Sequence, residues 1–197
     1  MTHAVAFFDK QFQRQIGQQD FALNPFETKA LAYAKGRMLD FGCGLGNLSM
    51  TAARRGSKVV AVDASPAAIA SLAARARQEN LPLEAIEADA ASFGWNGCFD
   101  TVASIGLLMF LPCGTARKLV PRLRDATCDG GTAIVNVLVQ GTTYLEMFGS
   151  DPYCLFDPEE VRAWFDGWKI ADFSLDDFAA PGNTTKRFAT VIAQKAH

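Results

Sequence analysis

The chain has 197 residues, of which 49% are hydrophobic, and a formal net charge of −2 at pH 7. This composition suits one compact domain. The net negative charge excludes non-specific binding of nucleic acid, which needs a basic face. No apolar run approaches the roughly 18 to 20 residues that span a bilayer, and the start MTHAVAFFDKQFQRQ lacks the pattern of a signal peptide. We therefore expect a soluble, cytoplasmic protein with no membrane partner.

The cysteines are widely scattered, at positions Cys43, Cys98, Cys113, Cys128 and Cys154. None of them forms a CxxC pair, so the spacing of a metal site is missing. Because their number is odd and a cytoplasmic protein keeps its thiols reduced, we expect reduced, mostly buried thiols and no bound metal.

An aromatic-rich segment, residues 1–36, precedes a regular alternation of strands and helices. Short apolar or β-branched runs predict strands, while amphipathic runs with a Ser-Pro start or a glycine stop predict helices. The predicted strands are 37–41, 57–63, 83–89, 99–106 and 130–140, and the predicted helices are 48–56, 66–80 and 114–128. Pro121 is expected to kink or shorten the last of these helices.

The C-terminal part of the chain has a different character. A capping-box pattern predicts a helix over 157–165. Two strands are predicted after it, 168–174 and 185–195, joined by the polar stretch 175–183. Because no helix separates these strands, we expect them to pair as an antiparallel hairpin.

The order of the elements predicts an α/β fold. Alternating strands and helices are typical of a parallel sheet with helices on both faces. We expect a Rossmann-like, mostly parallel seven-stranded sheet that ends in the antiparallel hairpin. Residues 1–197 would form a single domain, with a lid-like segment over 1–36 and the sheet core over 37–197.

The stretch MLDFGCGLGN (38–47) places Gly42, Gly44 and Gly46 at alternate positions after the first predicted strand. Ligands of parallel sheets bind at such exit loops, and glycine has no Cβ to obstruct them. A dinucleotide site uses G-x-G-x-x-G to hold a pyrophosphate. This chain has G-x-G-x-G preceded by Asp40, an acid that suits a cationic ligand, and Asp63 ends the second strand, where it can accept hydrogen bonds from a ribose. A tight turn without a ligand is the alternative.

Together, Asp40, the alternate glycines and Asp63 resemble the class I S-adenosylmethionine-dependent methyltransferases, and the terminal hairpin matches that class too. The resemblance implies S-adenosylmethionine as the cofactor and a small molecule as the methyl acceptor. It places the three loop glycines beneath the methionine moiety, Asp40 at its amino group and Asp63 at the ribose.

The same resemblance assigns residues farther along the chain. Ala64 would lie beside the adenine, Asp89 would receive the adenine amine, and Ala90 would supply a backbone N–H. The alternative for Asp89 is a helix cap. Ser104, Ile105 and Gly106 would line the reaction centre, with Ser104 as a candidate catalytic residue.

The residues that the chain lacks limit the kind of methyl acceptor that it could use. His3 and His197 lie at opposite termini, where frayed tails are expected, so an acceptor with a free lone pair is favoured over one that needs a histidine base. DNA amino-methyltransferases carry an Asn/Asp-Pro-Pro-aromatic loop where this chain has SIGLLMFL. Pro112-Cys113 lies too late to match the Pro-Cys nucleophile of cytosine-C5 enzymes. Nucleic acid is therefore not an expected partner.

Three stretches resemble the tellurite-resistance methyltransferases: LLMFLP, CLFDPEEVRAWFDGWKI and KRFATVIAQK. This resemblance implies a soft nucleophile, such as a selenium or tellurium oxyanion or a thiol. That family commonly has a His-Arg pair before its last strand, and the pair is missing here. Arg187 matches the arginine of its RFAT motif and is a candidate catalytic residue that could hold an anion by forked hydrogen bonds; a solvated charge at a strand end is the alternative.

The N-terminal segment is rich in phenylalanine, and lids in this class precede the first strand. We expect Phe8 or Phe12 to reach the site, because an aromatic ring attracts a sulfonium; for most of these rings, packing on the sheet is the alternative. Two other functions stay open: an O- or N-methyltransferase for a metabolite, and a non-catalytic module that binds the cofactor. The protein would be a monomer or a homodimer.

Overall fold

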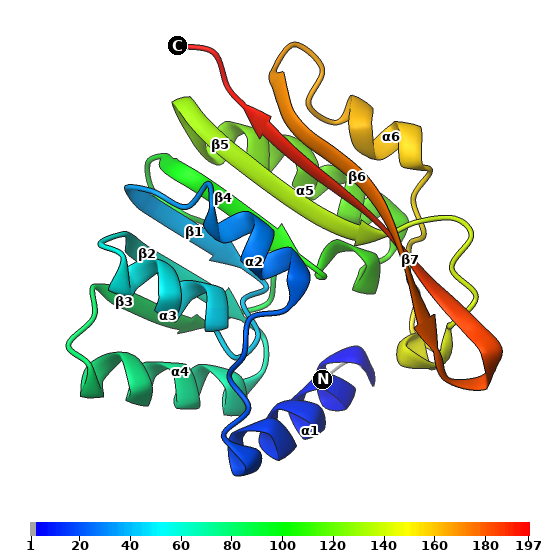
Figure 1. Ribbon diagram of the computed structural model, residues 1–197, viewed down its shortest axis with the longest axis horizontal. Coiled ribbons are helices and arrows are strands. Elements are labelled where there is room, and N and C mark those ends of the chain that lie inside the picture. The colour runs from blue at the N-terminus through cyan, green and yellow to red at the C-terminus, as the bar shows by residue number, and fades with distance from the viewer. Residues whose placement is uncertain (1–2) are drawn as a thin grey trace.

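The fold is built on one seven-stranded sheet with the order β3-β2-β1-β4-β5-β7-β6 (Figure 1). The computed structural model describes residues 3–197. Strand β7 is antiparallel to both of its neighbours, and the other pairs are parallel. The strands are β1 (Arg37–Phe41), β2 (Lys58–Asp63), β3 (Leu83–Glu87), β4 (Phe99–Ile105), β5 (Thr127–Leu138), β6 (Lys169–Ala180) and β7 (Thr184–Gln194). This topology confirms the predicted Rossmann-like sheet and its terminal hairpin.

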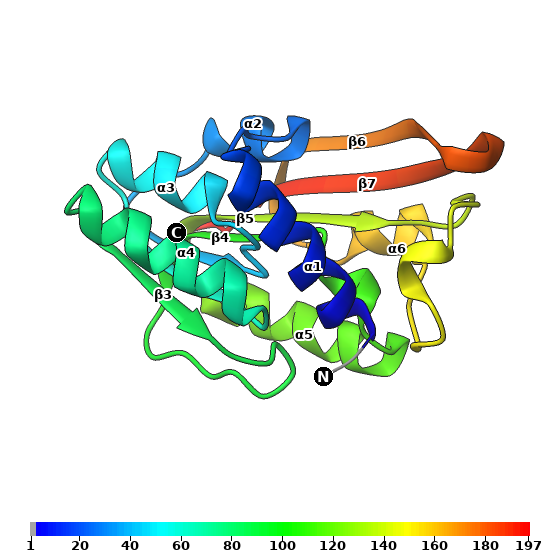
Figure 2. The ribbon, with the colours of Figure 1, turned by 90° about the horizontal axis from the view of Figure 1, so that it is seen from below.

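Helices cover both faces of this sheet. One face packs on α2 (Pro25–Leu31), α3 (Asn47–Arg54) and α4 (Pro66–Gln78), and the other packs on α5 (Cys113–Ala126) and α6 (Pro158–Ala163). Helix α1 (His3–Gln18) belongs to neither layer. It lies beside α4 (Figure 2). No helix in the described part of the chain is long and apolar enough to cross a membrane.

Local sequence signals explain where several helices begin. Ser65 precedes Pro66, and its Oγ accepts a hydrogen bond from the backbone N–H of Ala68, which caps α4. Pro121 does not shorten α5, which continues through the proline to its end at Ala126. Its buried face of alanine, leucine and valine packs on the sheet and offsets the missing backbone hydrogen bond.

The two C-terminal strands are longer than predicted. The polar stretch 175–183 was expected to be a loop, but β6 runs to Ala180, and only Pro181–Asn183 connects it to β7. The acids Asp176 and Asp177 are tolerated because β6 is an edge strand with solvent beside it. The extension matters because it carries Phe178 opposite Lys186.

The prediction of reduced cysteines is wrong for four of the five residues. Disulfides join Cys98 to Cys128 and Cys113 to Cys154, while Cys43 is free and buried. Cys98 directly precedes β4 and Cys128 lies at the start of its neighbour β5, so sheet pairing brings these two together. Sequence spacing could not reveal either pair, because 30 and 41 positions separate the partners along the chain.

Candidate functional site

A cavity of about 570 Å³ opens at the carboxyl ends of the parallel strands. Its walls come from the loops that follow β1, β2, β3 and β4, from α1 and α2, and from β5, β6 and β7. Ligands of open α/β sheets bind at this edge. A second cavity lies between α3, α4 and the end of α1.

The glycine loop after β1 forms the floor of the cavity. The backbone N–H groups of Gly42 and Cys43 donate to the carbonyl oxygen of Val62, 2.8 and 3.0 Å away, which holds the loop against β2. Gly44 has a φ of +52°, and a Cβ there would lie 3.0 Å from the ring of Phe12. Only glycine lets the backbone pass this close to the aromatic ring.

Asp63, at the end of β2, joins the first two loops. One carboxylate oxygen accepts from the backbone N–H of Gly44 at 2.8 Å, and the other accepts from Ser65 at 2.9 Å. Burial raises the pKa of Asp63, although these backbone donors oppose the rise. A carboxylate has about four acceptor positions, so Asp63 can still accept a hydrogen bond from a ligand.

Two further acids face the same end of the cavity. Asp40 is only 3% exposed and accepts a hydrogen bond of 2.6 Å from the hydroxyl of Ser49. Burial, with help from the nearby charges of Glu27 and Asp63, raises the pKa of Asp40 to about 7. Burial also raises the pKa of Glu27, which caps α2 through the backbone of Asn24. A cationic ligand would stabilise the ionised form of all three acids.

Another part of the cavity wall, formed by α2, β6 and β7, is aromatic. Phe26 from α2 contacts Phe178 and Phe188, with ring centroids 5.4 and 4.7 Å apart. The single cation among the described lining residues is Lys186, whose Nζ lies 4.8 Å from the centroid of Tyr144. The site is therefore divided into an acidic end and an aromatic end with one positive charge.

Helix α1 forms one wall of the cavity. Its side with Ala4, Phe8 and Phe12 faces the cavity, so both of the phenylalanines considered from the sequence line it. The ring of Phe8 lies 4.8 Å from that of Phe110. Asp9 ties the helix to the start of α4 by accepting a hydrogen bond of 2.5 Å from the hydroxyl of Ser65.

Most of the residues predicted to form the site come together in this cavity. Eight of them line it: Asp40, Gly42, Gly44, Asp63, Ala64, Ala90, Ile105 and Gly106. They come from the ends of four parallel strands, which confirms that the strand exits converge as the topology predicts.

Three other predicted residues do not line the cavity. Gly46 begins α3, and a Cβ there would lie 2.5 Å from the side chain of Leu72, so this glycine serves the packing of α3 on α4. Asp89 accepts from the backbone N–H of Ala91 at 2.8 Å and caps the turn after β3. Ser104 is fully buried on the other side of β4 from Ile105, and its hydroxyl has no partner there.

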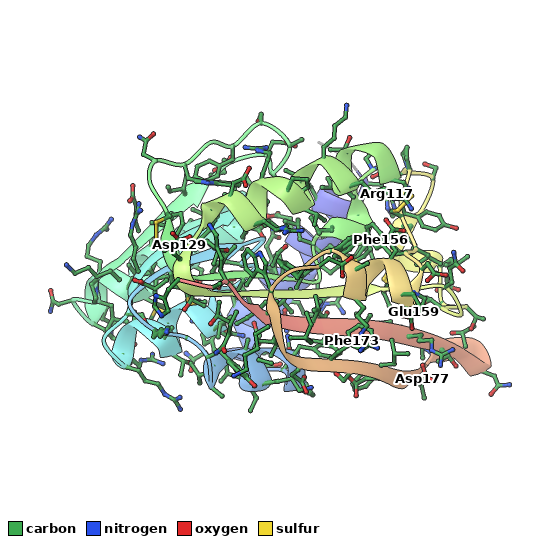
Figure 3. The ribbon with its side chains drawn as sticks, turned by 90° about the horizontal axis from the view of Figure 1, so that it is seen from above. Arg117, Asp129, Phe156, Glu159, Phe173 and Asp177 are labelled. Atoms are coloured by element: carbon green, nitrogen blue, oxygen red, sulfur yellow. A yellow bond between two sulfur atoms is a disulfide. The ribbon has the colours of Figure 1, made fainter. Side chains whose placement is uncertain are left out.

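Arg187 also lies outside the cavity, because neighbouring residues of a strand point to opposite faces. It opposes Asp177 in the hairpin and forms an ion pair of 3.4 Å with it. Asp177 and Phe173 lie on the face of β6 that α6 covers (Figure 3). Lys186, one position earlier, faces the cavity instead.

Several lining residues were missed by sequence reasoning. Glu27 had a visible signal, the capping box that it forms with Asn24. Lys186 had none, because it lies on β7, whose antiparallel register only the folded sheet defines. Asn136 lies near the end of β5, which is parallel to β4, and no motif in the sequence singles it out.

A family model described as a methyltransferase domain matches residues 38–131. The chain is also 31% identical over 177 residues to the Ubiquinone biosynthesis O-methyltransferase of Xanthomonas euvesicatoria pv. vesicatoria, in an alignment that covers 79% of this chain and 72% of that protein. It is shorter than some other curated relatives: it spans 54% of Hemagglutinin 1 from Eikenella corrodens, to which it is 27% identical over 166 residues.

Solved structures show the same fold. TehB from Haemophilus influenzae superimposes with a TM-score of 0.78 at 20% identity, covering 92% of this chain and 65% of that one. The N-methyltransferase NodS from Bradyrhizobium japonicum, in complex with S-adenosyl-L-homocysteine, has a TM-score of 0.72 at 14% identity and covers 96% and 99%. At these identities the likeness is one of fold.

Proposed function

Because the chain belongs to the class I S-adenosylmethionine-dependent methyltransferases, we propose that it transfers a methyl group to a small molecule bound at the aromatic end of the cavity. S-adenosylmethionine is the cofactor of this family. The resemblance to tellurite-resistance methyltransferases is supported, at the level of the fold, by the structural neighbour TehB. The acceptor and the roles of single residues are part of the proposal.

The acidic end of the cavity fits this cofactor. S-adenosylmethionine supplies a methyl group on a positively charged sulfur, and it also carries an ammonium group and a ribose. Asp40 and Glu27 would attract the ammonium group, while Asp63 would accept hydrogen bonds from the ribose hydroxyls. A pyrophosphate would instead meet three carboxylates, so a dinucleotide fits poorly.

The other lining residues take roles that follow from their places. Gly42 and Gly44 would pass beneath the methionine moiety, and Ala64 and Ala90 would lie at the adenine. Ile105 and Gly106, together with the lid helix α1, would exclude water from the sulfur. Positioning two reactants in a dry site can contribute on the order of 7 to 11 kcal/mol to catalysis.

One observation carries the proposal: the same cavity has a cation-attracting end and a separate aromatic end. A module that only binds the cofactor has no need for the second end. Lys186 provides a positive charge there for an anionic acceptor, which replaces the role that the sequence suggested for Arg187. Soft nucleophiles such as selenite, tellurite or thiols need no base, and neither histidine lines the cavity.

An O- or N-methyltransferase is the second candidate. It is favoured by the ring-lined wall of Phe26, Phe178 and Phe188, which suits a planar organic acceptor better than a bare oxyanion. The relative named for ubiquinone biosynthesis is itself an O-methyltransferase.

A panel of acceptors tests the function. The purified protein is incubated with S-adenosylmethionine and each of selenite, tellurite, a thiol, a phenol and an aromatic amine, and released S-adenosylhomocysteine is measured. Turnover of at least one acceptor is expected. Tight binding of the cofactor without turnover of any acceptor would contradict an enzymatic role and favour a binding module.

Replacing Asp63 with alanine is expected to weaken the binding of S-adenosylhomocysteine by about 1.5 to 3 kcal/mol, the range for a hydrogen bond to a charged group. The change removes the proposed ribose contact and also frees the backbone N–H groups of Gly44 and Ser65. Isothermal titration calorimetry measures the loss. Asp89→Ala is the matched control, because this acid caps a turn outside the cavity, and equal losses in both variants would contradict the assignment.

A further inference from the structure

Asn136, near the end of β5, presents an unused hydrogen-bond acceptor to the cavity. The side chain is fully buried and lines the cavity. Its Nδ2 donates a hydrogen bond of 2.9 Å to the hydroxyl of Thr190, which holds the amide in place, while its Oδ1 has no partner. Burying an acceptor without a hydrogen-bond partner costs free energy. We therefore expect a bound ligand to donate a hydrogen bond to this oxygen.

Asn136 lies next to the proposed reaction centre. Its backbone carbonyl accepts a hydrogen bond of 3.0 Å from Gly106, and it is paired with Ile105 across β4 and β5. Ile105 and Gly106 line the cavity at the exit of β4. A group that donates to Oδ1 of Asn136 is therefore held beside these two residues.

Lys186 faces the same cavity farther along β7. Asn136 is paired with Thr190, and Lys186 precedes Thr190 by four residues, a separation of roughly 13 Å along the strand. Its ammonium group contacts the ring of Tyr144 and has no carboxylate partner within the part of the chain that the structure describes. The length of the lysine side chain shortens the distance between the Lys186 ammonium group and Oδ1 of Asn136. A single oxyanion still cannot reach both groups.

The wall between these two polar groups is apolar. Leu138 and Phe188 are paired between Asn136 and Lys186, and Phe26 packs on the ring of Phe188. Phe178, opposite Lys186 on β6, completes the wall. A ligand that joins the two ends must therefore present a flat apolar body to these rings.

We propose that the acceptor is an aromatic amine that carries an anionic group: the anion at Lys186, the ring against Phe26 and Phe188, and an amino N–H donated to Oδ1 of Asn136. This inference rests on the proposed function and names its acceptor class. An amide oxygen is not a base, so the arrangement suits a neutral nucleophile that keeps its proton until after the transfer.

The step balances without a base in the protein. The nitrogen lone pair attacks the methyl carbon, the N–C bond forms and the C–S bond breaks, and the sulfur keeps the bonding electron pair. The methylated ammonium product then loses one proton to water. Asn136 orients the lone pair by holding an N–H that is not transferred in the step.

The test compares 4-aminobenzoate with aniline, which has the same amino group but no anion. With S-adenosylmethionine and the full chain, kcat/KM is expected to be at least tenfold higher for 4-aminobenzoate, the lower end of the effect of a charged hydrogen bond. Mass spectrometry identifies the N-methylated product. A lack of preference for the anionic amine, or methylation of selenite and thiols without either amine, overturns the inference.

Two variants locate the contacts. Lys186→Met is expected to raise KM for 4-aminobenzoate about tenfold and to leave aniline unchanged. If Arg187→Met causes the loss and Lys186→Met does not, the inference is wrong and the anion lies on the other face. Asn136→Ala is expected to lower kcat about tenfold for both amines, and retained affinity for S-adenosylhomocysteine shows that the variant is folded.

A binding measurement distinguishes a wrong acceptor class from a wrong proposed function. Calorimetry with 4-aminobenzoate, in the presence of S-adenosylhomocysteine, is expected to show binding that Lys186→Met weakens. Absence of 4-aminobenzoate binding while S-adenosylhomocysteine still binds overturns the acceptor class and leaves the proposed function standing. Failure of S-adenosylhomocysteine to bind overturns both.

Discussion

Between about pH 5 and pH 8, the free energy of unfolding of the cofactor-free protein is expected to fall by on the order of 3 kcal/mol. Burial raises the pKa of Asp40 from 3.8 to about 7. Between these values the folded state binds a proton that the unfolded state has lost, so the stabilisation is complete below the lower value and disappears as the pH rises through 7. Urea unfolding at a series of pH values measures the change.

Asp40→Asn is the matched control for this effect. The amide has nearly the same shape and can still bond to the hydroxyl of Ser49, but it does not titrate. The variant is therefore expected to show a flatter profile over the same range. A wild-type profile that is flat, or that rises with pH, would show that Asp40 is ionised at ordinary pH in the folded protein.

A comparable effect is expected from the disulfide between Cys113 and Cys154. Replacing both residues with serine is expected to lower the free energy of unfolding by about 3 to 4 kcal/mol, because the bond closes a loop whose ends are 41 positions apart and restricts the unfolded chain. Denaturant unfolding without reductant gives the value. The bond also holds the segment that contains Cys154, whose backbone N–H donates to the carbonyl oxygen of Met109 in the cavity wall.

Alkylation of the denatured, unreduced protein provides the independent check. A single label, on Cys43, is expected, because the other four cysteines are paired. Five labels on freshly purified protein would contradict both disulfides. Reductant should destabilise the wild-type protein and have less effect on the variant with serine at both positions.

Much of the fold and the acidic end of the site could be predicted from the sequence. β1 was predicted at Arg37–Phe41, its observed bounds, because a short apolar run ended by glycine is a strong local signal. Asp40, Gly42, Gly44 and Asp63 lie within a few positions of strand ends, and parallel strands bring their carboxyl ends to the same edge. Connectivity alone therefore assembles this half of the cavity.

The aromatic end could not be predicted in the same way. Phe26, Asn136 and Phe188 come from α2, β5 and β7, far apart in the sequence, and they meet only across the folded sheet. The choice between Lys186 and Arg187 depends on a single position of register, since successive residues of a strand face opposite sides. A family motif that names the arginine cannot say which side it faces.

The sequence by itself determined the fold class, the glycine loop and the cationic character of the cofactor, because these depend on signals between near neighbours in the chain. Only the tertiary structure decided which cysteines pair, where β6 ends and which basic residue enters the cavity. Those outcomes depend on the register of antiparallel strands and on contacts between distant segments. Such contacts form only when the whole sheet is assembled, and no local pattern records them.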